Sequence, residues 1–481
     1  MTKIIREFFL GGISLSLVNI SSKVVNLIIL PVITFYLLPE DFGIIAIYSL
    51  IIGILGMIYN PGIISVTIRL YYDNEDSSIE NKRLVGSSFG FLIIIPILLL
   101  LFSVFYGDLI FLQLFNDFDF WPYGFLAILA AMTVQPVRLW SNLWIAKKKV
   151  NRVAIISLLK IFISVILTLL LIIILELDAM GRILALLTSN FVIFIFASYD
   201  IINYSKLNFS FNKLIKILIL GFPLVFSVFS YVLMESTDKY MLEIFTDLGQ
   251  LGIYDIAYTL SSIPLFIILG FSQVWQPIFY ENMKKNLTGN IKKISNYYII
   301  SFSLVVFFVL IFSNEVFNLF IDQKFISALN IVPWIISGVF FLGLSNLIAT
   351  IYTYEKRFKM IGFLAIISAV INVFLNYYLI NYFGTIGAAI SSFITYLCYF
   401  LLLFYNLRNN IFDLFSKQVL IGSICIFLFF SILLIFFNNL LIDFNLYYTL
   451  GKIILSLLII YVLIKLKLIN LADLLDKKNK S

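Results

Sequence analysis

The feature that most constrains the fold is a set of apolar runs, each about 20 residues long, that recurs along the whole chain. A helix needs a run of this length to cross the hydrocarbon core of a bilayer. The 481 residues contain fourteen such runs. They are 10–37, 43–64, 85–106, 123–145, 153–175, 181–200, 216–245, 252–278, 294–313, 330–352, 361–381, 385–405, 418–437 and 447–464. We therefore predict an all-α integral membrane protein with about fourteen transmembrane helices.

Composition excludes most other classes of protein. Hydrophobic residues make up 62 % of the chain and charged residues only 12 %, about half the charged share of a soluble protein. The chain has no histidine, so the commonest metal ligand and general base are absent. Its cysteines, Cys398 and Cys425, lie in apolar runs and are interpreted as small apolar side chains. We predict no catalytic residue, metal site, cofactor or nucleic-acid partner.

The distribution of basic residues predicts the topology. With the N-terminus in the cytoplasm, 26 of the 33 Lys and Arg residues fall in cytoplasmic segments, as the positive-inside rule requires. We therefore expect both termini in the cytoplasm, with the basic segments facing anionic lipids. The first span is interpreted as retained rather than as a signal peptide. The tail 466–481 is expected to form a short amphipathic helix.

The chain also resembles itself at a nearly constant offset. Residues 39–44 match 248–253, Lys147-Lys148-Lys149 matches Glu355-Lys356-Arg357, and 178–181 matches 384–387, at offsets of 209, 208 and 206. Six spans separate the copies, so the two halves keep the same orientation, as in some transporters. The predicted domains are six-helix bundles at 1–205 and 206–412, two further helices at 413–465 and a cytoplasmic tail at 466–481, with a central cavity between the bundles.

Polar residues inside the spans identify a candidate binding site. Ionisable side chains at membrane depth are costly and usually face a bundle interior or a wet cavity. The first half places Lys23, Arg138 and Lys160 within spans, with no carboxylate in those spans to pair with them. Unpaired cations indicate an anionic ligand such as a diphosphate. The polar neighbours expected to share these helix faces are Asn19, Asn26 and Gln135.

Plainer interpretations of the same residues stay open. Arg138 and Lys160 could extend their side chains to the inner interface. Glu235 and Lys239, four residues apart on one helix, could neutralise each other. Polar stripes also hold membrane helices together. The sign of the charge argues for a site, since Ser368 stands in the second half where Lys160 stands in the first.

Three motifs resemble those of a known family. The stretch Leu37-Leu38-Pro39-Glu40-Asp41-Phe42-Gly43 is similar to its L-G-P-E-x-[FY]-G signature, with Leu38 in place of the usual Gly. Residues 238–242 with Gly252-Ile253-Tyr254 resemble its D-[KR]-x-x-[IL] … G-x-Y pattern, and 384–389 resemble G-x-x-G-A-A. The family is the polysaccharide flippases (Wzx-type O-antigen or capsule-unit transporters) of the multidrug/oligosaccharidyl-lipid/polysaccharide (MOP) exporter superfamily.

This resemblance implies a V-shaped, cation-lined cavity and the flipping of a polyprenyl-diphosphate-linked oligosaccharide to the outer leaflet. Lys23, Arg138 and Lys160 would hold the diphosphate and nearby sugar. Glu235, Asp238 and Asp255 would be candidates for coupling transport to an ion gradient. An O-unit polymerase and glycosyltransferases would be the expected partners, beside membrane lipids, and a bacterial inner membrane would be the expected location.

Other functions remain possible at this point. The two extra C-terminal spans are shared with fourteen-span members, which include flippases of lipid II, the peptidoglycan precursor. A cation-coupled drug exporter is disfavoured because its substrates are often cationic. A non-transporting scaffold for glycan assembly would not depend on the three cations. An enzyme is the weakest alternative, because there is no visible catalytic constellation.

Overall fold

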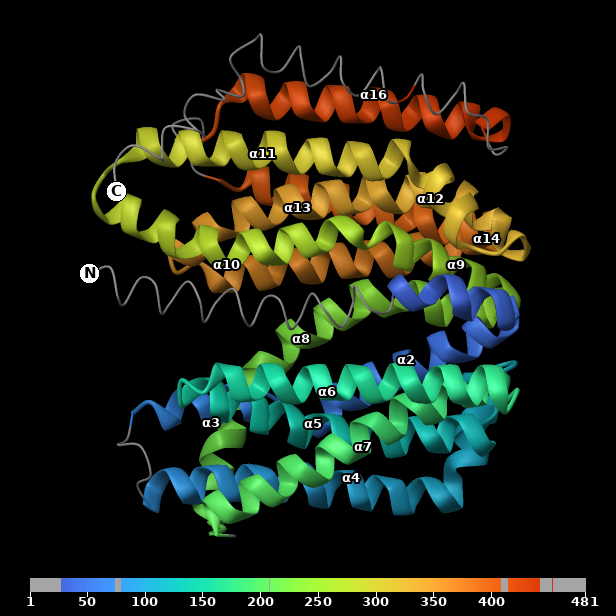
Figure 1. The fold of residues 1–481 in the computed structure, drawn as a ribbon. Coiled ribbons are helices and arrows are strands. Elements are labelled where there is room, and N and C mark those ends of the chain that lie inside the picture. The colour runs from blue at the N-terminus through green and yellow to red at the C-terminus, as the bar shows by residue number, and fades with distance from the viewer. Residues whose placement is uncertain (1–26, 74–78, 207, 408–413, 442–451, 453–481) are drawn as a thin grey trace. The chain divides into compact units, whose positions relative to one another are not determined.

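All the regular elements that the structure describes are helices. The structure is a computed structural model, and it describes residues 27–73, 79–206, 208–407, 414–441 and 452 (Figure 1). A short helix over 27–36 comes first. The helices that follow in the first half of the chain are α2 Pro39–Tyr59, α3 Ile63–Tyr71, α4 Ile79–Leu114, η1 Phe120–Gly124, α5 Phe125–Ala146, α6 Val150–Leu169, η2 Leu170–Ile174 and α7 Asp178–Ser205. Those in the second half are α8 Phe211–Phe245, α9 Leu248–Ser261, α10 Ile263–Lys284, α11 Thr288–Ile311, α12 Ser313–Phe320, η3 Gln323–Asn330, α13 Val332–Tyr354, α14 Phe358–Tyr405 and α16 Lys417–Leu441.

The predicted all-α membrane fold is confirmed. Within the described residues, nine helices are long and apolar enough to cross a membrane. One of them, α14, contains the two predicted spans 361–381 and 385–405, joined at a kink where Gly384 has φ 55° and ψ −132°. The predicted span 447–464, the tail 466–481 and most of span 10–37 lie outside the described residues.

One predicted span is divided into two helices. The run 252–278 is covered by α9 and α10, which are separated at Ser262. Pro264 lies in the first turn of α10, where its missing N–H costs nothing, whereas it would clash with a carbonyl inside a continuous helix. Hydropathy alone shows no break, because both segments are apolar.

The chain divides into two compact units. Unit 1 comprises residues 1–255 and 373–385, and unit 2 comprises 256–372 and 386–481. Helix α8 packs with α2, α3 and α4 and so belongs to unit 1. The predicted domain limits depend on the sequence repeat rather than on packing, and they stay a prediction.

Unit 1 is built around α5, which packs against α2, α4 and α7. Its core contains Trp140 and Leu143 of α5, Phe89 and Leu92 of α4 and Ile201 of α7, all buried. Figure 1 shows α4, α5, α6 and α7 running alongside one another. Apolar side chains on the outer helices, such as Phe162 of α6, are exposed, as expected for surfaces that meet lipid.

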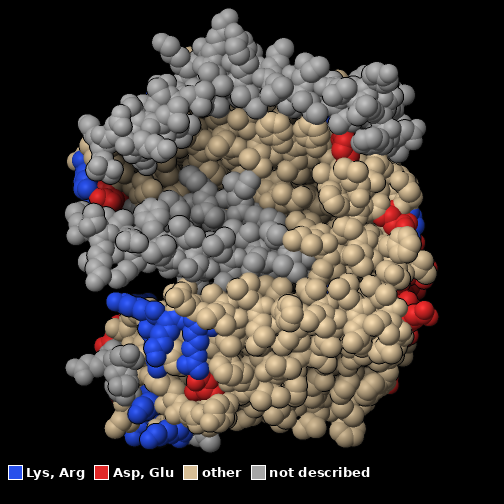
Figure 2. All heavy atoms as spheres, viewed as in Figure 1, with Lys and Arg blue, Asp and Glu red and all other residues tan. Residues whose placement is uncertain are grey.

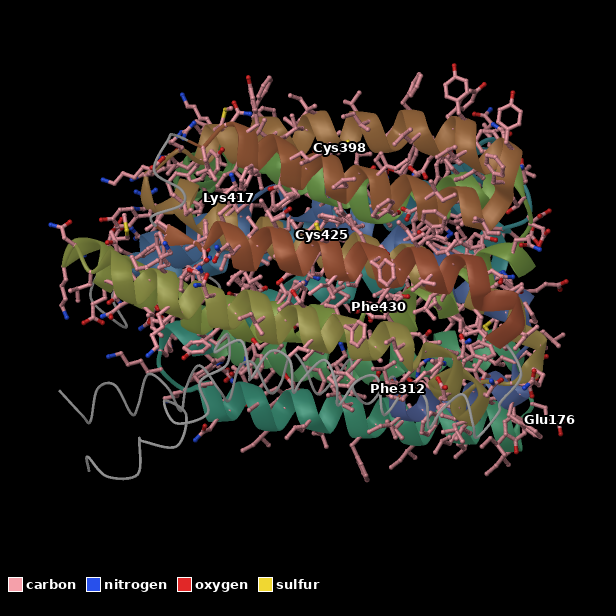
Figure 3. All side chains as sticks on the ribbon, turned by 90° about the horizontal axis from the view of Figure 1, so that it is seen from above. Glu176, Phe312, Cys398, Lys417, Cys425 and Phe430 are labelled. Carbon is pink, nitrogen blue, oxygen red and sulfur yellow. The ribbon has the colours of Figure 1, made fainter. Side chains whose placement is uncertain are left out.

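Unit 2 is built around α13, which is buried along most of its length. It packs against α10, α11 and α16. The rings of Phe302, Phe340 and Phe427 stack in sequence, with centroids 6.1 and 4.0 Å apart. Figure 3 shows Lys417 at the start of α16 and Cys425 and Phe430 further along it. Cys398 and Cys425 are both free thiols on separate helices.

The first of the three repeat matches forms a reciprocal contact within unit 1. A Cβ at Gly43 of α2 would lie 2.0 Å from the carbonyl oxygen of Leu248, and a Cβ at Gly252 of α9 would lie 1.8 Å from that of Pro39. Leu248 is the repeat equivalent of Pro39, and Gly252 is the equivalent of Gly43. Each copy therefore makes with the other the contact that it receives, which is the geometry of a pseudo-twofold axis. Only glycine permits backbones to approach this closely.

The other two matches share unusual backbone angles. Lys148 and Lys356, at the centres of the matched basic turns, have φ 58° and 60°. Asp178 and Gly384, which begin the third pair, have φ 44° and 55°. Positive φ is uncommon for residues other than glycine, so its appearance at matched positions is independent evidence for the repeat.

Candidate functional site

The candidate site is built on α5 and α6, two neighbouring helices of unit 1. Arg138 lies in the second half of α5, two residues after Pro136, and its side chain is exposed. The side-chain amide of Asn142, one turn later, donates to the carbonyl of Arg138 at 2.9 Å. Lys160 lies at mid-length in α6 and is partly exposed.

Arg138 and Lys160 form a pair of like charges. The two helices pack together, so the two cations lie on adjoining helices of unit 1. Among the residues that the structure describes, neither side chain forms an ion pair with a carboxylate. Two uncompensated cations on adjoining helices can hold a ligand with at least two negative charges, which a diphosphate supplies.

Gln135 does not share the exposure of Arg138. Its side chain is 1 % exposed and packs against α2, where a Cβ at Gly56 would lie 2.7 Å from Nε2 of Gln135. The one-face arrangement expected for Gln135, Arg138 and Asn142 therefore separates into a buried amide and two exposed side chains. Gln135 is placed to position α5 against α2 rather than to touch a ligand beside Arg138.

Four predicted site residues are not placed by the structure. Lys23, Asn19 and Asn26 lie outside the described residues, and the side chain of Glu235, on α8, is not described either. Their predicted roles stay predictions.

The second sequence motif forms a connection between α8 and α9. Tyr254 of α9 donates its hydroxyl to Asp238 of α8 at 2.5 Å, and Asp238 is 2 % exposed. The next residue, Lys239, pairs with Asp255 at 2.5 Å. Consecutive residues of one helix thus bind consecutive residues of the next. Lys239 therefore has a carboxylate partner on α9, whereas the sequence suggested only Glu235, on its own helix, as a partner.

The first motif fixes the start of α2. Asp41 accepts from the backbone N–H of Leu38 at 2.7 Å, which caps the helix, and its other oxygen accepts from the N–H of Ala179 at 3.2 Å. A carboxylate in the first turn also interacts favourably with the helix dipole. Asp41 therefore joins the beginning of α2 to the beginning of α7.

Two buried charged residues were not predicted from the sequence. Arg182 of α7 is 8 % exposed and donates to Oγ1 of Thr168 at 2.6 Å. Glu243 of α8 is fully buried, and one carboxylate oxygen accepts from the backbone N–H groups of Asn116 and Asp117 at 2.7 and 2.9 Å. Both residues lie within a few residues of a span end, where a charge normally indicates a solvated loop.

Comparison of the chain with family models identifies its family. The model described as "Polysaccharide biosynthesis protein" matches residues 9–283, more than half of the chain. The chain belongs to the polysaccharide biosynthesis protein family. The match covers two of the three sequence motifs, as well as α5 and α6 with their cations. No curated protein matches the sequence.

Several solved structures have a fold similar to that of this chain. The lipid II flippase MurJ in an inward closed conformation aligns with a TM-score of 0.75 at 16 % identity, covering 94 % of this chain and 98 % of that chain. A multidrug resistance MATE family transporter of the MOP superfamily, inward-facing, aligns with a TM-score of 0.65 at 16 % identity, covering 81 % and 97 %. An outward-facing structure of a MATE family transporter gives 0.57 at 13 % identity, with 82 % and 94 % coverage. The polysaccharide biosynthesis family member thus has the fold of MOP-superfamily membrane transporters.

Proposed function

We propose that this chain moves oligosaccharide units carried on a polyprenyl diphosphate from the cytoplasmic to the outer leaflet of a bacterial inner membrane. The observation that carries the proposal is the pair Arg138 and Lys160 on adjoining helices, which no described carboxylate neutralises, in a chain of the polysaccharide biosynthesis family. A diphosphate carries the negative charge that would neutralise two such cations. Arginine binds it through two parallel hydrogen bonds and lysine as a point charge.

The rest of the predicted site belongs to the same proposal. Lys23, with Asn19 and Asn26, would add a third cation and polar groups for the sugar. Glu235, Asp238 and Asp255 are proposed to couple transport to an ion gradient. We place both termini in the cytoplasm, and we propose a polymerase and glycosyltransferases as partners that use and supply the lipid-linked unit.

The test is complementation of a strain that lacks the gene, with surface polysaccharide as the readout. Arg138→Gln with Lys160→Ser, and separately Lys23→Ala, should each reduce export about tenfold or more, because a lost contact to a charged group costs roughly 1.5–3 kcal/mol. Lys359→Gln removes an exposed cation elsewhere and should leave export unchanged. Normal export by the double variant, with the protein present in the membrane, would refute the proposal.

A lipid II flippase is the second candidate, favoured by the larger share of this chain that the MurJ fold covers, 94 % against 81 % for the MATE transporter. Depletion of the protein separates the two functions. Healthy cells that lack only a surface glycan support the oligosaccharide substrate, whereas lysis on depletion supports lipid II.

A further inference from the structure

The turn between α5 and α6 carries an unusual concentration of positive charge. Lys147, Lys148, Lys149 and Arg152 lie within six residues. Figure 2 shows basic side chains gathered on the left of the view, at this end of the unit 1 helices. Within the described part of the chain, Asp200 of α7 pairs with Arg152 of this group at 3.2 Å. Its second oxygen accepts from the indole N–H of Trp140 at 2.7 Å.

Aromatic rings hold three of the four cations in place. The Lys147 ammonium lies 3.4 Å from the ring centre of Tyr204. Lys149 and Arg152 lie 4.9 and 4.1 Å from the ring centre of Trp144. Each contact of this kind contributes roughly 0.5–2 kcal/mol and restricts a long side chain that would otherwise move freely. Lys148 and Lys149 remain exposed at the surface of this preformed arrangement.

The second copy of the turn shows what the fold itself requires. Tyr352 stands in place of Trp144, Arg357 stacks on it at 4.7 Å, and Lys356 has the same positive φ as Lys148. However, Glu355 replaces Lys147, and it pairs with Arg357 at 3.3 Å. The turn therefore forms equally well with a carboxylate at its surface. The conformation of the turn therefore does not require the all-cationic surface of the first copy.

The position of this turn relates it to the cation pair deeper in the same helices. Arg138 lies nine residues before Lys147 on α5, and Lys160 lies eight residues after Arg152 on α6. At 1.5 Å per residue, each distance is roughly 12–14 Å along the helix axis. A headgroup bound at the turn would have the next two cations ahead of it on the same two helices.

We propose that Lys148 and Lys149, supported by Lys147 and Arg152, form a landing site for the diphosphate of the lipid-linked substrate before it reaches Arg138 and Lys160. This inference rests on the proposed function and adds the residues that capture the substrate. Charges at the entrance to a site mainly raise the rate of association, by attracting the ligand over several ångströms, whereas direct contacts to the bound ligand mainly slow its release.

The test measures binding kinetics with the full-length protein in phosphatidylcholine nanodiscs. The probe is farnesyl diphosphate with a fluorophore on its prenyl end, followed by stopped-flow anisotropy, with empty nanodiscs as the blank. Lys148→Asn with Lys149→Gln should slow association roughly fivefold or more and flatten its dependence on salt, while dissociation stays within about twofold. Asparagine suits the positive φ at position 148.

The matched control is Lys356→Asn with Lys359→Gln, which removes two exposed cations from the second turn. It should associate within about twofold of the wild type. Equal slowing in both variants, or in neither, would overturn the landing site. In nanodiscs made of equal parts phosphatidylcholine and phosphatidylglycerol, the wild type should still associate with the probe faster than the Lys148→Asn, Lys149→Gln variant. Equal association rates there would also overturn the landing site, because bulk anionic lipid would then occupy the turn.

A third variant separates this inference from the proposed function. Arg138→Gln with Lys160→Ser should release the probe faster without slowing its association. If its kinetics match the wild type while the first-turn variant is slow, the landing site stands and the deeper site is refuted. If only the deeper variant changes, the landing site is refuted and the proposed function stands.

Discussion

Single residues without side chains determine how closely α2 and α9 approach each other within unit 1. Gly43 and Gly252 lie at matched positions, and each receives a backbone carbonyl where a Cβ would be. Gly53, ten residues further along α2, has no atom within 4 Å of the place its Cβ would occupy. The same helix therefore contains one glycine that the contact requires and one that it does not.

This difference predicts opposite effects of the same substitution. Gly43→Ala should lower the free energy of unfolding by about 1–3 kcal/mol, since a backbone rather than a flexible side chain must move. Gly53→Ala should be neutral or raise it by roughly 0.5–1 kcal/mol, because alanine favours the helix. Unfolding by SDS titration in detergent micelles measures both. A Gly43→Ala protein as stable as the Gly53→Ala protein would contradict the reciprocal contact.

The sequence predicted individual site residues only in part. Arg138 and Lys160 are candidates because each is a charge inside an apolar run, and their role stays a prediction. Arg182 and Glu243 could not be found, because near a span end a buried charge and a solvated one look the same. The sequence likewise did not indicate which carboxylate on α9 pairs with Lys239. Asp255 is 16 residues away and is brought close by the turn between α8 and α9, whereas helical spacing indicates only neighbours on one helix.

At the scale of elements, hydropathy located the helices and separated the two spans that meet at the α14 kink, but it missed the break between α9 and α10. The limits of α7 and α13 lie within five residues of the predicted spans, because the length of an apolar run is set by the membrane. Breaks depend on single residues instead. Pro264 lies where α9 gives way to α10 without any change in hydropathy, whereas Gly384 forms the kink in α14 between two spans that were predicted separately.

The kink in α14 predicts a stability effect that comes from backbone conformation alone. Both Gly384 and Gly422 have open space where a Cβ would be, but only Gly384 has a positive φ. Gly384→Ala should therefore lower the free energy of unfolding by about 1–3 kcal/mol. Gly422→Ala in α16 should not lower it. The same SDS titration compares them, and equal stability of the two variants would show that the kink does not need glycine.

At the scale of the whole molecule, the two halves of the chain share backbone features but differ in where they carry positive charge. The repeat is visible in the glycine contact and in the matched positive φ angles, so both halves keep the same backbone devices. The cations differ between them. Lys160 corresponds to Ser368, which is buried and donates to the carbonyl of Leu364 one turn earlier. Lys147 corresponds to Glu355 in the same way. Anion binding is thus expected to belong to one copy only.

Moving the charge between the copies tests this asymmetry. Lys160→Ser introduces the residue that the second half already uses, so α6 should fold normally while export of surface polysaccharide falls about tenfold. Adding Ser368→Lys restores the net charge but places the cation on α14 instead of α6, and export should stay low. Lys160→Arg keeps a cation beside Arg138 and should retain most of the export. Each variant is compared at equal membrane abundance by immunoblot. Recovery of export by the Lys160→Ser, Ser368→Lys protein would mean that total charge, rather than its place on α6 beside α5, determines function.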